Sequence, residues 1–160
     1  MRYLTRISLL VFCILLVTAC TDSESAVRKT VEEAAQAAEN GLNRRNLSAV
    51  EPYFATVEEG AIAAGLDETE RSPQSFLDSL TSSDRVQFHS FDVQSVAMHE
   101  NGGLARVTYR LHLSVIRNSE VFYSAVVTQD IALLKTARGW RISGGDTPQL
   151  SEVSGEWPPH

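Results

Sequence analysis

Few side chains in this 160-residue chain are suited to acid/base or metal chemistry. His89 and Asp92 lie three residues apart, and a histidine oriented by a carboxylate can take up a proton near neutral pH. Pointing together into a pocket, they would serve an enzyme of the isomerase, dehydratase or cyclase type. The sequence contains no glycine-rich phosphate loop, Gly-x-Ser-x-Gly elbow, His-Glu-x-x-His motif or Cys-x-x-Cys pair. We therefore assign no catalytic residue, and we expect no metal and no cofactor.

Cys20 follows a segment with the features of an export signal. Arg2 and Arg6 precede an apolar run over residues 7–17, which is shorter than the ~20 residues that span a bilayer. The stretch Val17-Thr18-Ala19-Cys20 resembles the bacterial lipobox, whose cysteine becomes the lipidated first residue after cleavage. We predict a signal peptide over residues 1–19, lipidation of Cys20 and a lipidated tether over residues 20–25. The alternative is a signal peptide that is cleaved elsewhere.

This prediction places the mature protein outside the cytoplasm, held by its lipid on the cell membrane or outer membrane with the domain facing the periplasm or exterior. The chain is acidic, with a formal net charge of −6, and it loses Arg2 and Arg6 with the signal. Nucleic-acid binding needs a basic surface, so we expect no nucleic-acid partner. Cys13 also leaves with the signal, so no disulfide can hold the fold.

The candidate side chains must be positioned by four apolar-rich segments, residues 86–98, 104–117, 121–135 and 139–144, which predict an antiparallel meander. Three-residue loops would place Phe91 opposite Leu113 in the first hairpin and Leu111 opposite Val127 in the second. The first segment breaks its alternation near Ser90, which predicts a β-bulge there.

Alternation gives this sheet one apolar face, and it turns Arg110, His112 and Asp130 to the other face. The apolar face and the helix beside it carry four hydrogen-bonding side chains that we name as candidate pocket residues: Tyr53, Tyr109, Tyr123 and Gln129. The opposite face carries Ile116, Phe122 and Val126 among polar residues, and an open face of this kind can form a homodimer.

Helical periodicity predicts three helices before the sheet: residues 27–42, a second that begins after Asn46, and a third that begins at Pro73. Residues 57–71 fit a helix and a loop equally well. Residues 147–160 lack periodicity and predict an extended C-terminal tail. The expected fold is α+β, with three N-terminal helices packed on a strongly bent antiparallel meander over residues 26–146.

This pattern resembles the nuclear transport factor two-like superfamily, which includes ketosteroid isomerases, polyketide cyclases and many binding-only domains. The resemblance lies in residues 39–50 leading to Tyr53-Phe54, in residues 104–109, and in residues 133–135 and 139–142. It implies a cone-like, cystatin-like roll with a pocket between helices and sheet, and no particular activity. We expect a non-enzymatic envelope lipoprotein whose mostly apolar pocket binds an apolar small molecule or an envelope protein. The acid/base enzyme described above is the alternative.

Overall fold

The computed structural model describes residues 2–56, 58–59, 73–99 and 101–156. It confirms an α+β chain with one antiparallel sheet of five strands. The helical elements are α1 (Arg2–Arg44), the 3₁₀ turns η1 (Leu47–Ala49) and η2 (Glu51–Tyr53), and α2 (Pro73–Ser79); the strands are β1 (Arg85–Met98), β2 (Leu104–Arg117), β3 (Glu120–Thr136), β4 (Gly139–Gly145) and β5 (Gln149–Ser154). Most of residues 57–71 lie outside the described residues, so the choice between helix and loop stays open there.

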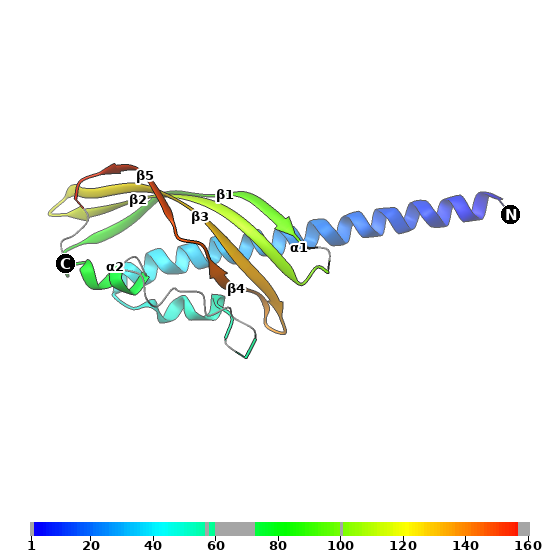
Figure 1. Cartoon of the computed structure of the whole chain (residues 1–160), viewed down its shortest axis with the longest axis horizontal. Coiled ribbons are helices and arrows are strands. Elements are labelled where there is room, and N and C mark those ends of the chain that lie inside the picture. The colour runs from blue at the N-terminus through cyan, green and yellow to red at the C-terminus, as the bar shows by residue number, and fades with distance from the viewer. Residues whose placement is uncertain (1, 57, 60–72, 100, 157–160) are drawn as a thin grey trace.

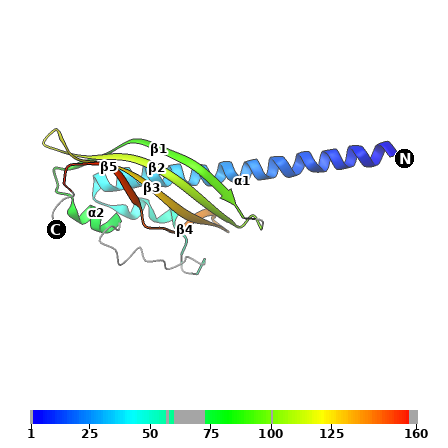
Figure 2. The same ribbon diagram turned by 45° about the horizontal axis from the view of Figure 1, so that its top comes forward.

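The sheet has the strand order β1-β2-β3-β4, and β5 pairs with β3 beyond the end of β4. The long strands β1, β2 and β3 curve over the C-terminal part of α1, while the N-terminal part of α1 projects beyond the sheet (Figures 1 and 2). One face of the sheet is therefore covered by helix. Most buried residues of β2 and β3 lie on the predicted apolar face, where Val107, Val115 and Leu133 are fully buried, while Ser114 and Val126 are buried on the opposite face.

The second hairpin has the predicted register, with Leu111 opposite Val127 and Val115 opposite Tyr123. Its turn is one residue shorter than predicted, because Arg117 pairs with Glu120. Asn118 and Ser119 both have positive φ, 52° and 68°, as a two-residue hairpin turn of the favoured hand requires.

The register predicted for the first hairpin is wrong, since Phe91 lies opposite Leu111 and not Leu113. The predicted bulge is present between Phe88 and Ser90, but a second one lies between Val93 and Ser95. Two differences from the predicted hairpin together shift the pairing of β1 with β2 by two residues. The loop closes between His99 and Leu104, and the second bulge adds a residue to β1. An even shift keeps each side chain on its face, so Phe91 still points to the apolar side.

Strand β5 occupies residues that the sequence predicts only as an extended tail. Its side chains are all exposed, so it has no alternation of apolar and polar residues by which to be recognised. Backbone pairing with residues 124–128 of β3 holds it in place, and Glu152 adds an ion pair with Arg110 at 2.7 Å. Its end passes close to β3: a Cβ on Gly155 would lie 2.1 Å from the carbonyl oxygen of Phe122.

The predicted second helix is replaced by the two short turns η1 and η2. Asn46 does act as a cap, since its side chain accepts a hydrogen bond from the Ser48 amide at 2.9 Å. Pro52 lies in the first turn of η2, and Phe54 then takes an extended conformation that pairs with Ile142 of β4. This pairing ends the helical segment and holds residues 54–56 beside the sheet.

Three side chains of α1 bond the backbone of β1 along its outer edge, which pairs with no other strand of the described residues. Asn43 both donates to and accepts from Val86, at 2.8 and 2.9 Å, and Glu39 accepts from the Phe88 amide at 2.9 Å. Arg28 donates to the Val93 carbonyl at 2.8 Å. These bonds fix the rotation of α1, so its apolar side faces the sheet.

The buried residues form two clusters, one at each end of the helix-covered face. The first joins Val27 and Val31 of α1 to Val107, Leu133 and Trp140 of the sheet. The second surrounds Leu42 of α1 with Phe76 and Leu80 of the α2 region and with Val86, Leu111, Leu113, Val115 and Tyr123 of the sheet. Residues 35–38 in the C-terminal part of α1 lie between these clusters, where packing is incomplete.

Candidate functional site

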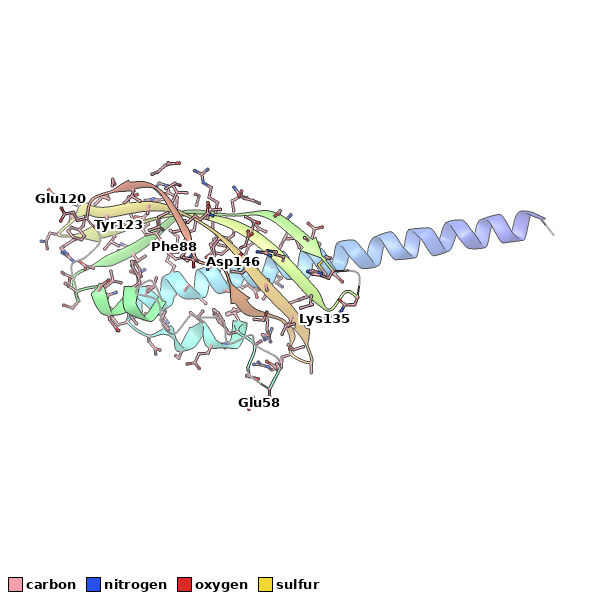
Figure 3. All side chains as sticks on the ribbon, viewed as in Figure 1. Glu58, Phe88, Glu120, Tyr123, Lys135 and Asp146 are labelled. Carbon is pink, nitrogen blue, oxygen red and sulfur yellow. The ribbon has the colours of Figure 1, made fainter. Side chains whose placement is uncertain are left out.

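A cavity of about 980 Å³ lies between residues 31–42 in the C-terminal part of α1 and the apolar face of the sheet. This volume is at the upper end of the range for small-molecule sites. Phe88 lies on the side of β1 that faces α1 (Figure 3), and it lines the cavity with other apolar side chains of the strands. These strand residues are Phe88, Phe91, Leu111, Ile131 and Ile142.

The cavity exists because α1 presents its smallest side chains at this point. Ala34, Ala35 and Ala38 line it, and the larger Val31 and Leu42 line it on either side of them while also packing into the two core clusters. A methyl side chain on a helix leaves the space that a leucine would fill, and protein interiors otherwise contain few voids. Helical periodicity places these alanines on the apolar side of the helix predicted over residues 27–42, and their small size already indicates a gap.

A chain of hydrogen bonds forms the polar part of the lining. The Tyr109 hydroxyl donates to Oε1 of Gln129 at 2.6 Å, and Nε2 of Gln129 donates to the backbone oxygen of Asp146 at 2.6 Å. A Cβ on Gly145 would come within 3.2 Å of Gln129 Nε2, so a glycine at this position leaves room for the amide. The amide is thereby held against the wall of the cavity.

Burial raises the pKa of Tyr109 to about 12, because the phenolate form would lose its hydration. Its ring also packs against Phe91, with the ring centroids 5.2 Å apart. Tyr109 is therefore neutral near pH 7, where it offers hydrogen bonds and cannot act as a base.

The four candidate pocket residues separate into two pairs. Tyr109 and Gln129 line the cavity and bond each other. Tyr53 packs against the first core cluster, and Tyr123, which is 1% exposed, is part of the second. Alternation along a strand gives the face of a side chain but not its position along the cavity, so the sequence does not separate these two pairs.

His89 and Asp92 lie on the opposite face of the sheet, away from the cavity. The Nε2 atom of His89 is 2.7 Å from the Ser114 hydroxyl, and its ring centroid is 4.7 Å from that of His112. Asp92 is exposed and lies across from Arg110. The proposed acid/base pair is thus not brought together at the cavity.

The opposite face is also less open than the sequence indicates. Val126 is 3% exposed, and the guanidinium of Arg117 lies 4.1 Å from the ring centroid of Phe122. Ile116 is half-buried. The homodimer through these three residues stays a prediction, with little free apolar surface to support it.

The mouth of the cavity lies between η2 and the β4–β5 connection, where the exposed lining residues are found. Glu51, Thr56 and Asp146 contribute polar groups to this rim. The Asp146 carboxylate is paired with Arg106 at 2.5 Å, whereas no ion pair neutralises Glu51 among the described residues. The described part of the rim therefore carries one unpaired negative charge, at Glu51.

The cavity lining within the described ranges contains no lysine, arginine or histidine. In the same part of the chain, no group of three or more histidine, cysteine or acidic side chains is placed to hold a metal ion. No helix among the described residues is long and apolar enough to cross a membrane.

Comparison with protein-family models and with curated proteins gives no match to this chain. The site must therefore be interpreted from its own chemistry. An apolar cavity with one fixed phenol and one fixed amide can bind and orient an uncharged molecule. Among the described lining residues, the titratable side chains are Glu51, Tyr109 and Asp146, and no hydrogen bond joins any two of them.

Proposed function

We propose that this chain is a non-enzymatic envelope lipoprotein whose domain binds an apolar small molecule between α1 and the sheet. Signal cleavage before Cys20 and acylation of its thiol would tether the domain to the bilayer on the external side of the membrane. The nuclear transport factor two-like fold, with three N-terminal helices and a cone-like roll, belongs to this proposal. The long curved strands over α1 support it.

The observation that carries the proposal is the cavity of about 980 Å³, with its apolar walls and its single hydrogen-bonded polar chain. A void of this size gives up packing that larger side chains on α1 would supply, at a cost that grows with cavity volume. Occupation by a ligand compensates that cost. The enzyme alternative gains no support, because His89 and Asp92 lie on the other face.

The test is binding of the neutral fluorescent probe N-phenyl-1-naphthylamine to the mature chain. Ala38→Phe should fill the cavity and weaken probe binding at least tenfold. Ala37→Phe is the matched control, because Ala37 is the adjacent residue of α1 and does not line the cavity. Thermal unfolding of both variants shows whether they keep the fold.

Probe binding that is saturable in the original chain, lost in Ala38→Phe and kept in Ala37→Phe supports the proposal. Absence of binding in the original chain, or equal binding by the two variants, overturns it.

A further inference from the structure

We propose that the cavity selects neutral amphiphiles: ligands with an uncharged hydrocarbon body and one hydroxyl or carbonyl oxygen, to the exclusion of anionic lipids. This inference rests on the proposed function and names the class of ligand. It comes from the charges around the cavity and from the hydrogen-bonding capacity of Gln129 and Tyr109.

Anions find no cationic partner among the described residues of this cavity. A carboxylate or phosphate that enters an apolar site loses its hydration, and it binds only where a cation or several N–H groups replace the water. The described lining holds no cationic side chain. An anionic headgroup left at the mouth instead meets the carboxylate of Glu51, which has no ion-pair partner among the described residues. Both orientations of an anionic lipid are therefore disfavoured.

A neutral oxygen, by contrast, finds a complementary pair of groups. The Gln129 amide has two N–H bonds, of which one is donated to the Asp146 carbonyl, so the other is available to a ligand oxygen. Tyr109 donates its proton to Gln129 and retains oxygen lone pairs that can accept from a ligand hydroxyl. Since the pKa of Tyr109 is raised to about 12, this arrangement persists across the neutral range.

The experiment compares dodecanol, sodium dodecanoate and dodecane as competitors for N-phenyl-1-naphthylamine on the mature chain near pH 7. The three share one hydrocarbon length and differ only in the headgroup. Dodecanol should displace the probe at least tenfold more effectively than dodecanoate, and several-fold more effectively than dodecane. Dodecanoate should gain affinity as the pH is lowered towards the pKa of the fatty acid, while dodecanol should not.

Two variants separate the two causes of selectivity. Gln129→Leu should remove the advantage of dodecanol over dodecane and leave dodecanoate weak. Glu51→Lys should strengthen dodecanoate, whereas Glu120→Lys, with the same change of charge at the distant start of β3, should not.

Failure of the ligand class is distinguishable from failure of the binding function. If the probe binds and Ala38→Phe abolishes its binding, but dodecanoate competes as well as dodecanol, the selectivity proposed here is wrong and the cavity remains a binding site. Equal competition by dodecanol and dodecane in the original chain would likewise overturn the role of Gln129. If the probe does not bind at all, both proposals fail.

Discussion

Replacing Asp84 with asparagine should remove a contribution to stability that depends on pH. Asp84 is 5% exposed, and its carboxylate accepts two hydrogen bonds from Arg117, at 2.7 Å from Nε and 2.8 Å from Nη2. The amide of Thr81 donates a third, at 2.8 Å. The bonds from Arg117, followed by the smaller effect of Thr81, lower the pKa of Asp84 from 3.8 to about 2 despite its burial.

The size of the effect follows from this pKa difference. Each pKa unit corresponds to about 1.4 kcal/mol, so the ionised carboxylate contributes about 2 kcal/mol to the free energy of unfolding near pH 7. The folded-state pKa is the lower one, so the contribution is complete above the pKa of the unfolded state. It is lost as the pH falls from about 5 to about 2.

Urea unfolding of the original chain and of Asp84→Asn, at several pH values, measures this contribution. The difference between their free energies of unfolding should shrink by about 2 kcal/mol between about pH 7 and about pH 2. Glu120→Gln removes an exposed carboxylate at the start of β3 that forms no ion pair among the described residues, and as the control it should change the free energy of unfolding by less than about 1 kcal/mol. A pH-independent difference for Asp84→Asn would refute the reasoning, because the pair would then contribute nothing through ionisation.

Three further predictions concern the core, the last strand and the N-terminus. Leu111→Ala should lower the free energy of unfolding by about 2 to 5 kcal/mol, since removal of a buried leucine leaves a cavity. His112→Ala on the other face of the sheet should lower it by about 1 kcal/mol or less. Comparable losses for the two variants would contradict the assignment of faces. Gly155→Ala should release the end of β5, because φ is 80° and the added Cβ meets Phe122, and amide hydrogen exchange in β5 should accelerate. Gly103→Ala, with no atom closer than 3.8 Å, is the control, and unchanged exchange in Gly155→Ala would refute the clash. Cys20→Ser should abolish fatty-acid labelling and leave an uncleaved precursor; labelling that survives would show that another residue is acylated.

The sequence predicts the sheet well where side chains or local turns determine it. The second hairpin keeps its register because Asn118 and Ser119 accept positive φ, and the buried face follows from alternation in β2 and β3. The second bulge of β1 is not predicted by alternation in the sequence, although Val93 and Val96 both pack on the first core cluster and lie three residues apart. Strict alternation cannot put two such residues on one face, so this spacing required a bulge.

Features that depend on backbone bonds or on empty space are harder to predict. Strand β5 is held by its main chain, so its exposed side chains carry no pattern. The cavity depends on the small size of Ala34, Ala35 and Ala38 relative to what faces them, which is known only once helix and sheet are brought together. Tyr109 and Gln129 were found because they share the apolar face, but the bond between them is a property of the paired strands.

The bonds between α1 and β1 also have a consequence for behaviour at high concentration. A fourteen-residue strand at the border of a sheet offers a row of unpaired amides and carbonyls to which a strand of another molecule can add. Here Asn43, Glu39 and Arg28 occupy groups on Val86, Phe88 and Val93, and the two bulges interrupt the regular spacing that a partner strand would need. The helix thereby protects the sheet from intermolecular β-pairing, and loss of these side chains should appear first as self-association at concentrations where the fold is still intact.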